Sequence, residues 1–181
     1  METIKIVVFA LGLFFGIETT SVVAKKTTVT VDPTEKTIII QQENLLAIYP
    51  KTENSTTVEK QFSEIYTKKE QWNTLFDSYP EKSIVYSSPK KGVLNATITL
   101  KYNTTKDLKA YAIDVNRENK FSIINIPQWK LETTDGELNG NYWNFDADKP
   151  FSFSYHPVEE VPEKYTVDHE LIFNVWEKIS K

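Results

Sequence analysis

The sequence predicts an α+β domain: a mainly antiparallel sheet of about eight strands, with a helical insert and a C-terminal helix. Polar and apolar residues alternate most clearly from Leu94 to Asn103, as in a strand with one buried face. Apolar residues recur at helical spacing after Thr56 and again after Val167. Connections are short and composition does not change along the chain, so we expect a single domain over residues 25–181.

The strands are expected in sequence order. Residues 27–31 and 37–41 are rich in β-branched side chains and flank a turn at Pro33, which favours a hairpin. Residues 45–49 form either a third strand or one helical turn. Asp135-Gly136 is a favoured pair for a type I′ turn and predicts a tight hairpin. Further strands are expected at residues 94–103, 109–115, 120–126, 129–134, 137–145 and 151–155.

Two segments have a helical apolar stripe. The insert is expected as one helix or two short ones and runs from Thr56, which has capping-box spacing to Glu59, as far as Phe76. Pro80 ends it. The C-terminal helix is expected over residues 167–179. A closed barrel is the alternative architecture, because a meander of this many strands removes its exposed edges by closing.

The first 24 residues predict export. Lys5 precedes a run of apolar residues and glycine at 6–17, which is shorter than the ~20 residues needed to span a bilayer. Val22 and Ala24 then occupy the two small-residue positions of a cleavage site. We therefore expect a signal peptide over residues 1–24 and a periplasmic or secreted protein, with an uncleaved anchor as the alternative.

The composition excludes several classes of function. The chain has no cysteine and its one methionine is Met1, which excludes thiol catalysis, disulfides, zinc–thiolate sites and iron–sulfur clusters in the mature protein. The formal net charge is −4 and there is no basic block, which argues against nucleic acid as a partner. The glycines are too scattered for a phosphate-binding loop. We expect no cofactor.

The candidate catalytic and metal-binding groups each have a structural explanation. Asp135 and Glu137 flank a glycine that favours a turn, and Asp146 and Asp148 alternate in a segment without the glycine of a calcium loop. The two histidines lack the spacing of a metal-binding motif. We therefore expect no catalytic residue and no metal site. A hydrolase of polysaccharides that uses two of these carboxylates is the alternative function.

The aromatic residues are the remaining candidates for a binding role, although core packing is the favoured interpretation for the set as a whole. Tyr142 and Trp143 lie among asparagines and Trp129 follows Pro127. Trp or Tyr on a sheet face beside polar groups can stack on sugar rings. We therefore expect a non-enzymatic ligand- or partner-binding domain of the cell envelope, with these three candidate ligand-binding residues. The ligand would be a small apolar molecule, a sugar or an envelope protein. The competing interpretation is that Trp143 and Phe145 pack under a helix, with Tyr142 on the opposite face.

The sequences INIPQW at 124–129 and NGNYW at 139–143 resemble parts of small exported proteins of unknown function from Flavobacteria-like Gram-negative bacteria. The resemblance covers the middle third of the chain and the leader, and it carries no defined motif. It implies no activity, and it adds only to the expectation of export.

Overall fold

The computed structural model describes residues 13–17, 20–67, 79–125, 130–156, 161 and 163–181. Within them the chain forms a seven-stranded and a four-stranded sheet, in which all the strand pairs are antiparallel. Neither sheet closes into a barrel in this part of the chain. The α+β class with a mainly antiparallel sheet is therefore confirmed.

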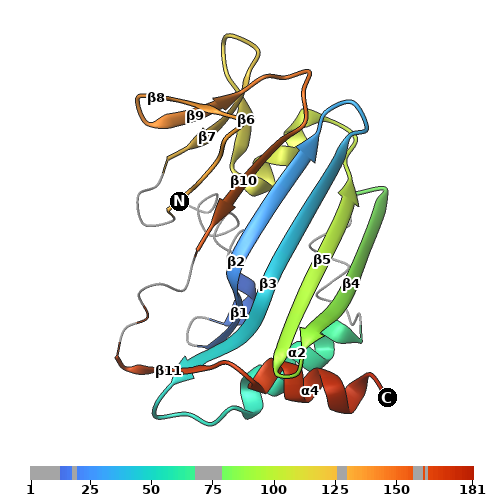
Figure 1. Cartoon of the computed structure of the whole chain (residues 1–181), viewed down its shortest axis with the longest axis vertical. Helices are drawn as coiled ribbons and strands as arrows, with labels where there is room; N and C mark the ends of the chain where they lie inside the picture. Colours follow the sequence, from blue (N-terminus) through green and yellow to red (C-terminus); the bar gives the residue numbers. More distant parts are fainter. Residues whose placement is uncertain (1–12, 18–19, 68–78, 126–129, 157–160, 162) are drawn as a thin grey trace.

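The seven-stranded sheet, called the large sheet below, runs along most of the molecule (Figure 1). Its order is β1 (Leu13–Ile17), β2 (Thr20–Asp32), β3 (Thr37–Pro50), β5 (Val93–Lys101) and β4 (Glu81–Lys90), with β10 (Phe151–Tyr155) also beside β2 and β11 (Tyr165–Asp168) also beside β3. The predicted hairpin around Pro33 is confirmed. The side chain of Asp32 supports its turn by accepting the backbone N–H groups of Thr34 and Glu35.

The long strand β3 includes residues 45–49, which therefore form neither a separate strand nor a helical turn. The strand continues through Asn44, although the φ of Asn44 is 55°. The backbone N–H of Asn44 donates to the side-chain oxygen of Asn95 in β5, 2.9 Å away. The N–H group therefore has a hydrogen-bond partner although the strand is irregular here. In β5 the predicted alternation is confirmed, because every second residue from Leu94 to Leu100 is buried.

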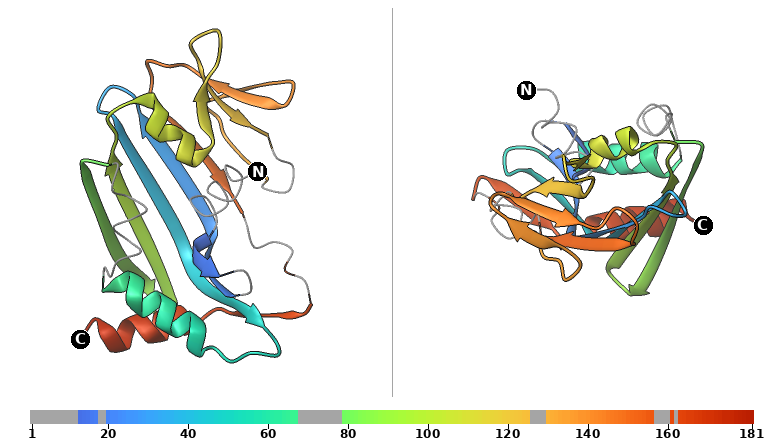
Figure 2. Two further views of the ribbon diagram at one scale, coloured as in Figure 1. Left: turned by 180° about the vertical axis from the view of Figure 1, so that it is seen from behind. Right: turned by 90° about the horizontal axis from the view of Figure 1, so that it is seen from above.

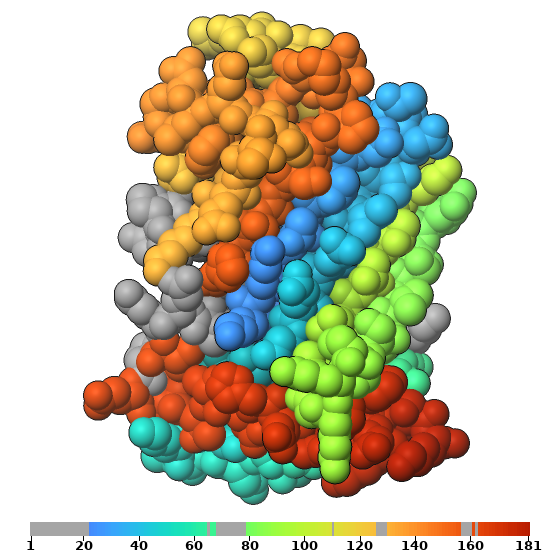
Figure 3. Space-filling view, viewed as in Figure 1, coloured from blue at the N-terminus to red at the C-terminus, as the bar shows by residue number. Residues whose placement is uncertain are grey.

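Helices cover the large sheet at two places along its length. They are α2 (Thr56–Tyr66), the 3-10 helix η1 (Thr105–Tyr111) and α4 (Leu171–Ile179). Figure 2 shows α2 and η1 against the same face of the sheet. α2 also packs on α4, and Figure 3 shows α4 and β11 covering one end of the molecule.

The helix starts differ from the predicted ones for local reasons. Glu59 accepts a hydrogen bond from the hydroxyl of Ser55, 2.6 Å away, instead of pairing with Thr56. The last helix begins at Leu171, because residues 165–168 pair with β3 as β11. The remainder of the predicted insert, residues 68–78, lies outside the described residues. None of the described helices is long and apolar enough to cross a membrane.

The four-stranded sheet, called the small sheet below, lies at the end of the molecule opposite α2 and α4 (Figure 1). Its order is β6 (Ile113–Val115), β7 (Phe121–Ile124), β9 (Tyr142–Phe145) and β8 (Glu137–Asn139). The strand expected at 109–115 is wrong over its first half, which belongs to η1. The carboxylate of Asp107 accepts the backbone N–H groups of Asn103 and Thr104 and so favours a helical start there.

The hairpin expected at Asp135-Gly136 is also wrong. Residues 137–145 divide into β8 and β9, which are joined by a tight turn at Gly140 and Asn141, and Gly140 supplies the positive φ of 58° that such a turn needs. Of residues 129–134, the described part forms only an isolated bridge between Glu132 and Ser154. Sequence alone could not rank two glycine-containing turns that are five residues apart.

Strand β2 extends across the cleavage site that the sequence predicts. Val22 and Ala24 are fully buried and pair with Ala47 and Leu45 of β3. Export and cleavage of a signal peptide stay predictions. Cleavage after Ala24 would remove two buried residues, Val22 and Ala24, from the large sheet.

Candidate ligand-binding surfaces

One face of the small sheet, its inner face, packs on the large sheet. Cross-strand pairs place Phe121 opposite Phe145 and Ile123 opposite Trp143 on this face. The ring of Phe145 stacks on Phe151 of β10 with 4.3 Å between ring centroids. The aromatic residues of the inner face are therefore part of the core between the two sheets.

The candidate residue Trp143 belongs to this inner face. It is half-buried against the core, and its indole N–H donates to the side-chain oxygen of Asn125, 3.3 Å away. Trp143 and Phe145 share a face, as the competing interpretation has it, but Phe145 stacks on strand β10 and not on a helix. Trp143 and Tyr142 thus face opposite sides of one strand and cannot form a single flat platform.

Tyr142 lies on the outer face of the small sheet with 49% of its surface exposed. It is the only exposed aromatic residue among those whose side chains the structure describes. Ile124 of β7 and Asn139 of β8 lie directly opposite Tyr142 on its two sides. Trp129, the third candidate residue, lies outside the described residues.

Polar side chains lie beside Tyr142 on this face, on β8 and further along β9. Asn144 lies two residues further along β9, and its amide is held by Asn116 at 3.0 Å and by the carbonyl of Tyr142 at 3.3 Å. Glu137 lies opposite Asn144 and is exposed, as is Asn139. The side chains of Glu137 and Asn139 form no hydrogen bond with the described residues. Both are therefore available to a ligand that rests on the ring.

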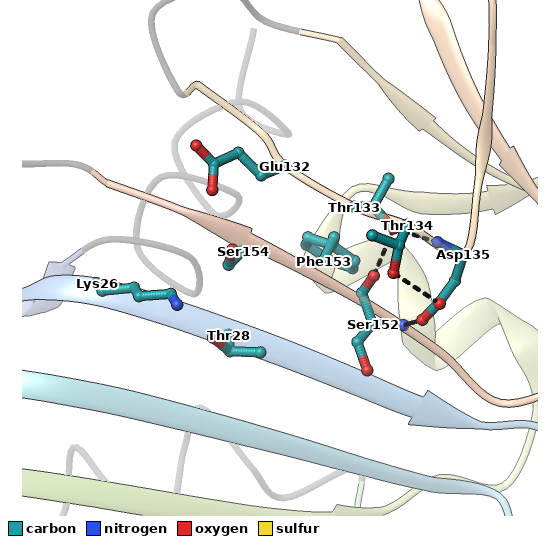
Figure 4. A pocket seen from close by; sticks show the side chains of 9 residues that line it. All are labelled: Lys26, Thr28, Glu132, Thr133, Thr134, Asp135, Ser152, Phe153 and Ser154. Carbon is teal, nitrogen blue, oxygen red and sulfur yellow. Dashed lines mark hydrogen bonds between the residues drawn. The ribbon is translucent and has the colours of Figure 1, made fainter.

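A second surface is an open polar hollow of about 330 Å³ beside strand β10 (Figure 4). Three segments far apart in the sequence line it: Lys26 and Thr28 of β2, Glu132 to Asp135, and Ser152 to Ser154 of β10. Sequence reasoning missed this hollow, because no short motif reports that residues about 100 positions apart meet. Its only aromatic lining residue, Phe153, is buried and offers no ring for stacking.

Much of the polar lining of the hollow already holds the chain in place. The carboxylate of Asp135 accepts the backbone N–H of Ser152 at 2.8 Å and the hydroxyl of Thr134 at 3.2 Å. Glu132 lies 3.9 Å from the imidazole of His156. The ammonium of Lys26 forms no ion pair with the described residues.

The other carboxylates considered for catalysis lie in separate places. Asp146 pairs with Lys149 at 2.6 Å, and this hydrogen bond and positive charge lower the pKa of Asp146, whereas a general acid needs a raised one. Glu137 belongs to β8, and Asp148 is exposed in the loop before β10. Within the described chain, no group of three or more histidine and acidic side chains is placed to hold a metal ion.

Comparisons with known proteins give no relative for this chain. No family model matches it, and no curated protein and no solved structure is significantly similar to it. The functional interpretation therefore rests on the two surfaces and on the chemistry of their side chains.

Proposed function

We propose that this protein is an exported, non-enzymatic domain that binds a sugar chain on the outer face of the small sheet. The single observation that carries the proposal is the exposed ring of Tyr142, which lies between Ile124 and Asn139 in the register of the sheet. Export is supported by the leader sequence, and the sugar class by the chemistry of this face.

The outer face has both parts that sugar recognition requires. The C–H face of a sugar ring packs on an aromatic ring, and the ring hydroxyls need donors and acceptors beside it. Directly opposed side chains in an antiparallel pair lie about 5 Å apart at Cβ, so Asn139 can reach the rim of a sugar stacked on Tyr142. Glu137 adds an acceptor on the same face.

The geometry also sets the expected strength of binding. A flat surface with one exposed ring buries little of its ligand, so a single sugar should bind with a Kd of roughly 1 mM. A polymer with many equivalent units binds more tightly in effect, because neighbouring sites raise the local concentration. A polysaccharide of the envelope is therefore a better ligand than a monosaccharide.

The carboxylates favour binding over hydrolysis. Asp135 is bonded to the backbone of Ser152, and Asp146 is bonded to Lys149. A glycosidase needs two carboxyl groups about 5–10 Å apart across the scissile bond, one of them with a raised pKa. The structural roles of these two carboxylates do not supply such a pair.

The test is saturation-transfer NMR of the purified protein with polysaccharides from its host envelope. Tyr142→Ala should abolish the sugar signals, whereas Tyr142→Phe should retain them, because stacking needs the ring and not the hydroxyl. Val85→Ala, at an exposed apolar residue of β4, is the matched control and should change nothing.

Unchanged binding by Tyr142→Ala would contradict the proposal. If Lys26→Ala then lost binding, the ligand would lie at the polar hollow instead. Since Tyr142 is half-exposed, its replacement should change the free energy of unfolding by less than about 0.5 kcal/mol.

A further inference from the structure

We propose that the folded domain begins at Val22, so that the signal peptide is cleaved between Ser21 and Val22 and not after Ala24. The inference rests on the export that is part of the proposed function. It concerns the processing site and is independent of sugar binding.

The residues on the domain side of the proposed cut belong to the core. Val22 and Ala24 are 0% exposed and Val23 is 3% exposed. The three residues pair in register with Ala47, Leu46 and Leu45 of β3. Val22 and Ala24 lie in the same hydrophobic cluster as Val58 and Phe62 of α2. They therefore join a central strand of the large sheet to the helix that covers it.

Cleavage after Ala24 would damage this part of the sheet. Strand β2 would then begin at Lys25, and its first pair with β3 would be Lys26 with Glu43. Three fully buried residues of β3 would then lose the β2 residues opposite them: Leu45, Leu46 and Ala47. Their backbone and side chains would be exposed on that side. An apolar strand with unpaired backbone groups at its edge is unstable and prone to aggregation.

Cleavage before Val22 meets the same sequence requirement and keeps the pairs of Val22, Val23 and Ala24 with β3. Either cut removes β1, which pairs with Val22 and Val23, so the two cuts differ in what β3 retains. A signal peptidase requires small residues at the first and third positions before the cut. Ser21 and Thr19 supply them for the Ser21–Val22 bond, as Ala24 and Val22 do for the later site. Water adds across the bond, which leaves a carboxylate on Ser21 and an ammonium group on Val22. The only pair with β3 that would be lost from the described register is Ser21 with Ile48.

The first test is the intact mass and N-terminal sequence of the protein recovered from the envelope and medium of its host. We expect Val22 as the first residue. Hydrogen exchange of the same sample should show protected amides among residues 23–24 and 45–47, at the alternate positions that bond between β2 and β3. An exported protein that begins at Lys25 would overturn the inference and leave export intact. An uncleaved chain in the cytoplasm would overturn both.

The second test uses the full chain and a matched pair of substitutions. Ser21→Tyr places a bulky side chain directly before the proposed cut and should slow processing about tenfold or more. Thr20→Tyr places the same side chain at the tolerant position between the two small ones and should be processed normally. Equal processing of the two variants at the rate of the natural chain would contradict a cut at Ser21–Val22.

Discussion

The carboxylate of Asp135 accepts a hydrogen bond from the backbone N–H of Ser152, 2.8 Å away. Two residues earlier, the hydroxyl of Thr133 donates to the carbonyl of the same Ser152, 2.6 Å away. The loop that leads into the small sheet is thus bonded to both backbone groups of one residue in β10. Asp135, which sequence reasoning considered as a catalytic acid, joins the two sheets.

We expect Asp135→Ala to lower the free energy of unfolding by about 1–2 kcal/mol, because a charge-assisted hydrogen bond between the sheets is lost. Asp135→Asn should cost less, since an amide oxygen can still accept the N–H of Ser152. Urea unfolding measures both. Asp148→Ala, in an exposed loop, is the control and should stay within about 0.5 kcal/mol of the natural protein. Equal stability of Asp135→Ala and the natural protein would show that this bond does not join the sheets.

Gly136 and Gly140 are required for different reasons. A Cβ atom at Gly136 would lie 2.6 Å from the ring of Phe145, which is buried and stacked on Phe151. A Cβ atom at Gly140 would meet nothing within 4 Å, but the φ of Gly140 is 58°. The first position is limited by space and the second by backbone conformation.

We therefore expect Gly136→Ala to lower the free energy of unfolding by about 1–3 kcal/mol, because Phe145 has to move. Gly140→Ala should cost about 1 kcal/mol from backbone strain. Asparagine distinguishes the two sites, because it tolerates positive φ: Gly140→Asn should be almost neutral and Gly136→Asn strongly destabilising. Thermal unfolding of the four variants checks this. A neutral Gly136→Asn would show that the ring of Phe145 has room to move.

Buried tyrosines should make the protein sensitive to alkali. Burial, aided by the negative charge of Asp107, raises the pKa of Tyr79 from 10.0 to about 12. Burial also raises the pKa values of Tyr111 and Tyr155 well above the usual range. The fold therefore favours the neutral hydroxyls. The stability that Tyr79 contributes in this way is complete below pH 10 and is lost as the pH rises through about 12.

The measurement is an ultraviolet titration of tyrosinate in the folded protein and in urea. In urea all tyrosines should ionise near pH 10, whereas in the folded protein the buried tyrosines should ionise only as the protein unfolds. Tyr79→Phe should remove one titrating group and weaken the fold modestly, because the Tyr79 hydroxyl donates to the carbonyl of Asp107 at 2.9 Å. A single transition near pH 10 for every tyrosine of the folded protein would contradict the expectation.

Local patterns in the sequence determined the strands and helices with the strongest periodicity. The alternation from Leu94 to Leu100 appears as predicted, and so does the first part of the helical stripe, where Val58 and Phe62 are buried. Each pattern reports which side chains share a face of one element. The period of two in a strand also places Tyr142 and Trp143 on opposite faces. The identity of the buried face is not local information.

Tertiary structure decided which face of each strand is buried and which side chains make up the two surfaces. Phe151 in β10 packs against Phe145, which makes the Trp143 side of β9 the inner face and leaves Tyr142 exposed. The polar hollow exists only because β2, the loop at Glu132 and β10 meet. Gly136 lies against the buried ring of Phe145, a contact between distant parts of the fold, whereas the turn lies at Gly140. Neighbours in sequence set the conformation of an element, whereas contacts between distant segments set which of its side chains reach a ligand.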